Sequence, residues 1–140
     1  MKKKVKISIR GLQESEGEKP SSYRFMTEGE LEETEGGIIF RYTESEITGF
    51  EGTVTTYDVT PERVILTREG PVSSQMLFEE GRKHYTLYTT PFGALTMGIT
   101  TLGLSSVLTD GGCDLSIHYT VDMDSSVISR NTFKISVREV

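Results

Sequence analysis

The sequence has 140 residues, a net charge of −6 and 35% hydrophobic residues, which predicts a single folded domain over residues 1–140 and excludes a disordered chain. Its acidic balance, with a pI near 5.0, would repel a phosphate backbone, so we expect no nucleic-acid partner. No stretch approaches the roughly 18 apolar residues of a membrane-spanning helix, and the single cysteine, Cys113, excludes an internal disulfide and favours a cytoplasmic protein.

Ten segments carry the alternation or the β-branched composition of β-strands, and turn residues separate them. In chain order they are residues 5–10, 23–31, 38–44, 52–59, 63–68, 72–78, 83–90, 94–104, 113–121 and 131–140. Residues 11–22 are polar and contain Gly17 and Pro20, so we expect a loop there. Gly36-Gly37 is typical of a hairpin turn, and residues 47–52, with two glycines, predict a corner in the chain.

The short spacing of these segments predicts the fold class. Because no segment shows a helical period, hairpin-length connections favour an antiparallel meander over β-α-β units. A long meander must protect its outer edges, and closing the sheet into a barrel removes them. We therefore predict an all-β fold, a single antiparallel β-barrel of about eight to ten strands, with a β-sandwich as the alternative. Gly98, in the middle of a predicted strand, favours a bulge or a tight bend.

Short motifs follow one another along the predicted strands and turns. They are Thr27-Glu28-Gly29, residues 42–49 (YTESEITG), residues 52–56 (GTVTT), Arg68-Glu69-Gly70, residues 78–81 (FEEG), residues 88–93 (YTTPFG), Tyr119 and Asn131. In this order they resemble the YwiB-like family of bacterial proteins, from about residue 5 to residue 139. The resemblance implies a calycin-like (lipocalin-like) β-barrel in the cytoplasm. It carries over no enzymatic activity, because none is established for that family.

Strand alternation predicts two charged side chains inside the barrel. Glu44 shares a strand face with Phe40 and Tyr42, and Arg68 shares a face with Leu66. If the apolar residues point inward, both charges are carried into the interior, where an unpaired charge is costly. Tyr42, Glu44 and Arg68 are therefore the candidate ligand-binding residues, as a polar floor for an anionic or polar ligand. A structural Glu–Arg pair near one barrel mouth is the alternative.

The other polar residues predict neither a catalytic nor a metal site. His84, His118 and Cys113 lack the short spacings of zinc ligands. The sequence has no nucleophile elbow, phosphate-binding loop or dinucleotide-binding motif, so we expect no cofactor and rank an enzyme last. One set of aromatic and aliphatic side chains is expected in the core: Tyr85, Leu87, Phe92, Leu95, Met97 and Ile99.

The leading hypothesis is a non-catalytic barrel that binds a small-molecule ligand in or near its mouth, because barrels of about eight strands can enclose one. The alternative is a structural or protein-interaction barrel with a filled interior. The volume of an interior cavity distinguishes the two. The sequence leaves the oligomeric state open, with a homodimer as one alternative.

Overall fold

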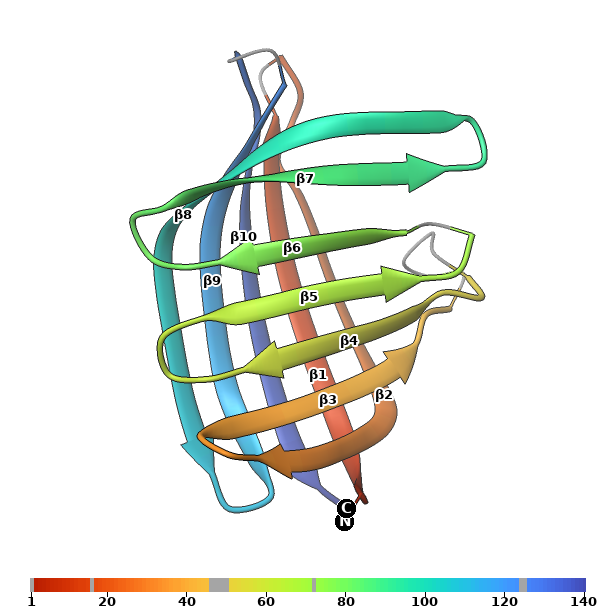
Figure 1. Cartoon of the computed structure of the whole chain (residues 1–140), viewed down its shortest axis with the longest axis vertical. Coiled ribbons are helices and arrows are strands. Elements are labelled where there is room, and N and C mark those ends of the chain that lie inside the picture. Colours follow the sequence, from red (N-terminus) through yellow and green to blue (C-terminus); the bar gives the residue numbers. More distant parts are fainter. Residues whose placement is uncertain (1, 16, 46–50, 72, 124–125) are drawn as a thin grey trace.

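The computed structural model describes the chain except for residues 1, 16, 46–50, 72 and 124–125. Its described part consists of ten β-strands joined by turns (Figure 1). The strands are β1 (Lys2–Ser15), β2 (Ser21–Thr34), β3 (Gly37–Thr43), β4 (Val54–Val59), β5 (Val64–Glu69), β6 (Ser74–Phe78), β7 (Lys83–Thr90), β8 (Gly93–Thr109), β9 (Gly112–Met123) and β10 (Ser126–Glu139). Within the described residues, no helix has the length and apolar character needed to cross a membrane.

All ten strands belong to one antiparallel sheet with the order β6-β5-β4-β3-β2-β1-β10-β9-β8-β7. Neighbours in the sheet are neighbours in the chain except at one place, where β1 pairs with β10. This pairing brings the two ends of the chain together, and the backbone amide of Val140 donates to the Lys4 carbonyl at 3.0 Å. The topology is therefore the predicted meander.

The barrel closes between its two outermost strands, β6 and β7. Ser73 and Thr89 exchange two backbone hydrogen bonds of 2.9 Å. Farther along the same seam, the Thr86 side chain donates to the Gln75 carbonyl in place of a backbone amide. The sheet is thus a nearly closed barrel, with a seam between β6 and β7 that side chains help to hold.

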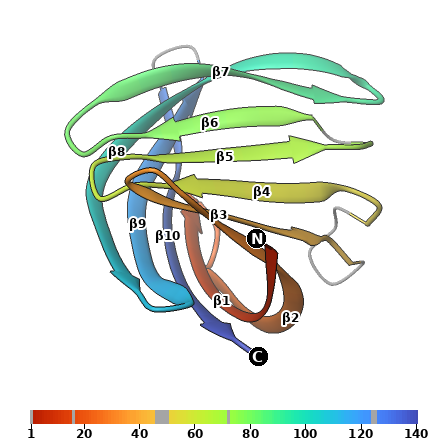
Figure 2. The same cartoon turned by 60° about the horizontal axis from the view of Figure 1, so that its bottom comes forward.

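Two layers of strands cross within this barrel (Figures 1 and 2). Strands β3 to β7 run across strands β1, β9 and β10, and the long strands β2 and β8 bend from one layer into the other. A register shift between Thr101 and Gly103 interrupts the pairing of β8 with β9. Such bulges bend strands and increase their twist, so this one helps β8 to change layers.

The core lies between the layers and is built from alternate residues of each strand. On β1, Val5, Ile7 and Ile9 are buried and the residues between them face outward. The rings of Phe40 and Tyr57 stack across β3 and β4 with centroids 4.8 Å apart. Full burial of one such apolar side chain stabilises a fold by about 1.5–3 kcal/mol, so this alternation fixes which face of the sheet turns inward.

The all-β barrel, its ten strands and the turn at Gly36 (φ +84°) are confirmed. The predicted loop over residues 11–22 is too long, because β1 continues to Ser15 and β2 begins at Ser21, although residues 17–20 do lie outside the strands. The polar end of β1 stays extended because its backbone groups bond to both neighbours; Gln13, for example, pairs with Asn131 and with Ser21. Most of the predicted corner over residues 47–52 lies outside the described residues.

The expected core set around β7 and β8 is mostly wrong. Ile99 is buried, but the exposed fraction is 71% for Tyr85 and 100% for Phe92, and Leu87 and Leu95 are also exposed. Tyr85 and Leu87 lie on the face of the hairpin opposite to the buried Thr86, which points them away from the interior. Alternation along a strand shows which residues share a face. It could not show that the solvent-facing side of this hairpin is apolar.

Gly98 lies in a regular part of β8 and pairs with Tyr85 on one side and Asp122 on the other. The register irregularity falls at Thr101–Gly103 instead, so the bulge alternative at Gly98 is wrong and the tight bend there stays a prediction. A Cβ atom at Gly98 would lie 2.5 Å from the Asp122 carboxylate. Asp122 forms an ion pair of 2.8 Å with Lys83, and this pair passes over β8 where Gly98 leaves room.

Candidate ligand-binding cavity

A cavity of about 460 Å³ opens at one end of the barrel interior. It lies toward the ends of β1, β3 and β5 and the beginning of β2. Its lining residues are Ile9, Leu12, Gln13, Ser21, Tyr23, Phe25, Tyr42, Glu44, Tyr57, Arg68, Tyr119, Asn131 and Phe133. Aromatic rings, amides, hydroxyls and both signs of charge therefore meet in one space.

Strand register explains why this end of the interior is polar. On strands β3 to β6, directly opposite residues form three successive inward-facing rows. The first row is Ile38, Val59, Val64 and Phe78; the second is Phe40, Tyr57, Leu66 and Met76; the third is Tyr42, Thr55, Arg68 and Ser74. The interior thus changes from apolar to polar within two steps along the strands.

Arg68 and Glu44 are both buried at this polar end. The exposed fraction is 9% for Arg68 and 4% for Glu44. Glu44 follows the last residue of β3, where its backbone amide donates to the Thr53 carbonyl at 2.8 Å. Its carboxylate accepts a hydrogen bond of 2.7 Å from the Thr55 hydroxyl. The alternation that predicted inward orientation for both charges is confirmed.

Tyr42 connects these charges to the aromatic side of the cavity. Burial raises its pKa far above the ordinary tyrosine value, and the Glu44 carboxylate, by its charge and by a hydrogen bond, raises it further. The positive charge of Arg68 acts in the opposite direction. Tyr57, which is also buried, raises the pKa of Tyr42 as well. Tyr57, Tyr42 and Glu44 are therefore coupled electrostatically across β3 and β4.

Four tyrosines, here called the cavity tyrosines, surround Arg68: Tyr23, Tyr42, Tyr57 and Tyr119. Burial raises the pKa of Tyr23 to about 12 and also raises the pKa of Tyr57 and of Tyr119. In all four, the Arg68 charge lowers the pKa against this effect. All four rings are neutral near pH 7, so the cavity offers hydroxyl groups that both donate and accept hydrogen bonds.

Tyr23 stands at the mouth of the cavity, where it is partly exposed. Its ring lies over Gly11, the residue directly opposite on β1, so closely that a Cβ atom there would be 2.3 Å from the ring. The same ring stacks on Phe25, with centroids 6.1 Å apart, and meets the edge of Phe133 at 6.5 Å. The missing side chain of Gly11 therefore makes the space that holds Tyr23 in place.

All three predicted ligand-binding residues, Tyr42, Glu44 and Arg68, line this one cavity. Whether they bind a ligand stays a prediction. Sequence reasoning missed several lining residues, which include Tyr23, Tyr57, Tyr119 and Asn131. Their alternation indicated inward positions, but only the register between distant strands shows that they share a cavity.

The residues considered for a metal site do not come together. His84 lies 2.9 Å from Glu79 across the β6–β7 turn, His118 is exposed on β9 and Cys113 is buried in the core. In the part of the chain that the structure describes, no group of three His, Cys, Asp or Glu residues is placed to hold a metal ion. Burial raises the pKa of the Cys113 thiol to about 12, which disfavours its reactive thiolate form.

Comparison with known proteins supports this fold. The crystal structure of the ywiB protein from Bacillus subtilis is similar to this chain with a TM-score of 0.87 and 19% sequence identity, over 99% of this chain and 93% of that chain. At this identity the similarity shows the fold alone. No curated protein matches the sequence. The family model for a domain of unknown function, DUF1934, matches residues 7–135. Since this match spans most of the sequence, the chain belongs to the DUF1934 family.

Proposed function

We propose that this protein binds a small polar molecule in the cavity of the barrel and performs no chemistry on it. One observation carries the proposal: buried Arg68 and Glu44 line the same cavity of about 460 Å³ as the four cavity tyrosines. Ligand pockets typically enclose about 300–1,000 Å³ and combine apolar walls with a few placed polar groups. The cavity therefore favours ligand binding over the alternative of a filled interior.

The lining indicates the kind of molecule. An acidic group suits Arg68, because a guanidinium binds carboxylate or phosphate oxygens with two parallel hydrogen bonds. A hydrogen-bond donor suits Glu44, and a flat ring suits the walls formed by Tyr23, Phe25 and Phe133. We infer a small ring compound that carries an acidic group and at least one N–H or O–H donor.

Native mass spectrometry of protein purified from its own host tests this proposal directly. We expect a fraction of the protein to carry an added small-molecule mass that is lost on denaturation. Tyr42→Phe, which removes one hydroxyl from the cavity, should reduce that fraction, whereas Tyr85→Phe, at an exposed site outside the cavity, should leave it unchanged. The same spectra would show a second protein subunit, the outcome that favours the interaction alternative.

A thermal-shift screen of small ring acids provides an independent result. Compounds that bind should raise the melting temperature of the wild type and of Tyr85→Phe, but raise that of Tyr42→Phe less. If the purified protein is empty and every compound shifts Tyr42→Phe as much as the wild type, the cavity is not a binding site.

A further inference from the structure

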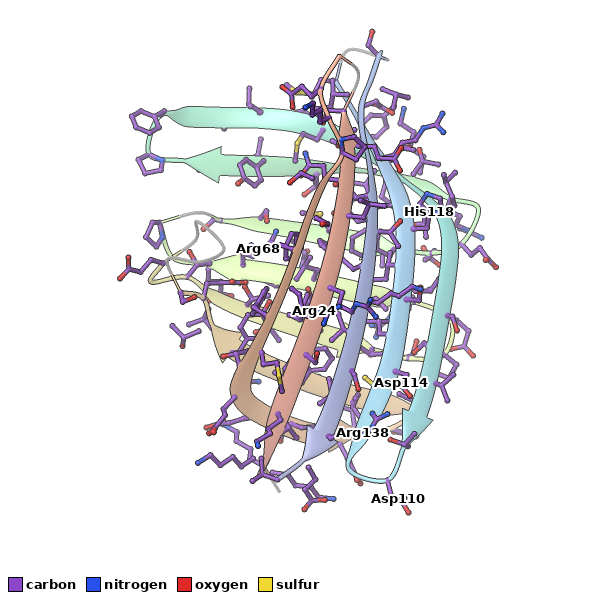
Figure 3. All side chains as sticks on the ribbon, turned by 180° about the vertical axis from the view of Figure 1, so that it is seen from behind. Arg24, Arg68, Asp110, Asp114, His118 and Arg138 are labelled. Atoms are coloured by element: carbon purple, nitrogen blue, oxygen red, sulfur yellow. The ribbon has the colours of Figure 1, made fainter. Side chains whose placement is uncertain are left out.

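A row of three positive charges lies on the outside of the barrel, beside a hollow that shares Leu12 and Tyr23 with the mouth of the cavity. Arg24 on β2 is directly opposite Arg10 on β1, and Arg10 is directly opposite Lys134 on β10. We call these three residues the basic row. All three are exposed, and Figure 3 looks onto this outer face and labels Arg24. In a chain with a net charge of −6, such a concentration of cations is unexpected.

Like charges directly opposite one another destabilise a sheet. The basic row contains two such pairs. Among the described residues, none of its three side chains has a carboxylate partner within 4.0 Å, whereas other cations of the same face do. Lys4 pairs with Glu28 at 3.3 Å, and Arg138 binds Asp114 with two hydrogen bonds of 2.9 Å. The row is therefore a local concentration of like charges on this face of the barrel.

The surface around the row is hollowed. An open hollow of about 480 Å³ is lined by all three residues of the basic row together with Leu12, Ser22 and Thr132, among others. A second hollow of about 310 Å³ begins at Arg10 and Lys134 and continues over β9 and β8. Its lining includes Ser8, Ser105, Ser116 and Ser136. Small hydroxyl residues thus leave space on both sides of the cations and offer further hydrogen-bond donors.

We propose that the basic row binds an oligophosphate chain, the group that nucleoside triphosphates share with inorganic triphosphate. Three cations on neighbouring strands span two interstrand spacings, roughly 10 Å, which suits a linear chain of phosphates better than a single anion. Arginine is the side chain best shaped for two-point binding of phosphate oxygens. A bound polyanion also offsets the repulsion between the three cations. The loss of this repulsion makes the free energy of binding more favourable.

Isothermal titration calorimetry with inorganic triphosphate at low ionic strength tests the site. We expect saturable binding that weakens as salt is added. Arg10→Gln and Lys134→Gln should each weaken it by about tenfold, the effect of losing one charge-assisted hydrogen bond. The matched control is Lys6→Gln, which removes an exposed charge from the same strand and face but outside both hollows; it should change the affinity less than twofold. Tyr42→Phe, in the cavity, should bind triphosphate like the wild type.

Two further measurements separate the alternatives. ATP should bind about as tightly as inorganic triphosphate if the phosphate chain alone is recognised, and more tightly if the nucleoside adds contacts; adenosine alone should not bind. Without ligand, Arg10→Gln should melt at a higher temperature than the wild type because it relieves the repulsion.

The proposal is overturned by any of three results: no saturable binding of triphosphate, equal losses in Arg10→Gln and Lys6→Gln, or tighter binding of a polyglutamate peptide than of triphosphate.

Discussion

Replacing Arg68 by methionine tests whether the buried charges of the cavity depend on each other. Methionine keeps an unbranched side chain of similar length, so the substitution removes the charge with little change in packing. Glu44, only 4% exposed, then stays in the interior without the positive charge of Arg68. In the wild type both charges affect the pKa of Tyr23, Tyr42 and Tyr57, in opposite directions. The variant is expected to be less stable than the wild type for this reason alone.

The magnitude follows from the burial of both groups. Removing one member of a buried charge pair costs about 3–5 kcal/mol, a large part of the about 5–15 kcal/mol that stabilises a typical domain. The matched control is Arg63→Met at the beginning of β5. Arg63 forms an ion pair of 3.2 Å with Asp58, but both side chains are about one-third exposed. Its loss should cost about 1 kcal/mol or less, as for other solvent-screened pairs.

Chemical denaturation of the wild type, Arg68→Met, Glu44→Gln and the double variant gives the coupling energy. The double variant should recover much of the loss seen in Arg68→Met, because the uncompensated charge is gone. A cost below about 0.5 kcal/mol for Arg68→Met, the level of a surface substitution, would refute the assignment of Arg68 to a desolvated interior. A large cost with no recovery in the double variant would show that Arg68 is stabilised by other groups than Glu44.

Four further expectations concern the interior of the barrel and the strands around it. The pKa of each cavity tyrosine lies above its ordinary value of 10.0, so stability should be lost as the pH rises above about 10, where the unfolded chain ionises first; ring-proton shifts by NMR that show ionised cavity tyrosines before the β-type circular dichroism is lost would contradict this. Gly11→Ala should displace Tyr23 from the mouth, which a change in Tyr23 ring-proton shifts by NMR would report, and an unchanged Tyr23 spectrum would argue against the contact. Cys113, which is fully buried, should react with alkylating reagents only in denaturant, and reductant should not change the melting temperature. Gly98→Ala should lower the melting temperature by displacing the Asp122 carboxylate, and a shift no larger than that of an exposed substitution would refute this role of Gly98.

Local alternation was enough to predict the strands and the inward direction of Tyr42, Glu44 and Arg68. The reason is that a strand turns successive side chains to opposite faces, so one apolar neighbour fixes the direction of the next-but-one residue. The same rule needs no knowledge of which strands are neighbours. It therefore predicted the inward direction of Tyr42 and Arg68, two members of the third interior row, and of Glu44, which follows β3, before the row itself was known.

The rest of the cavity depends on pairings between distant parts of the chain, which alternation does not contain. Tyr119 and Asn131 reach the cavity because β9 and β10 pair with each other and β10 pairs with β1. The predicted loop over residues 11–22 is too long for a related reason. The backbone of residues 11–13 is held by the ladders to β10 and β2, while their side chains include no run of alternating apolar residues.

On β4 and β6, the third interior row carries small hydroxyl side chains where the second row carries large ones. Phe78 and Met76 occupy the β6 positions of the first two rows, and Ser74 occupies that position in the third. On β4, Tyr57 gives way to Thr55 in the same step. A barrel selected only for a filled interior would place large apolar residues at these two positions, since each buried methylene contributes about 0.8 kcal/mol. Here Thr55 and Ser74 flank the buried Arg68 instead, and it is Arg68, not these two hydroxyl residues, that lines the cavity.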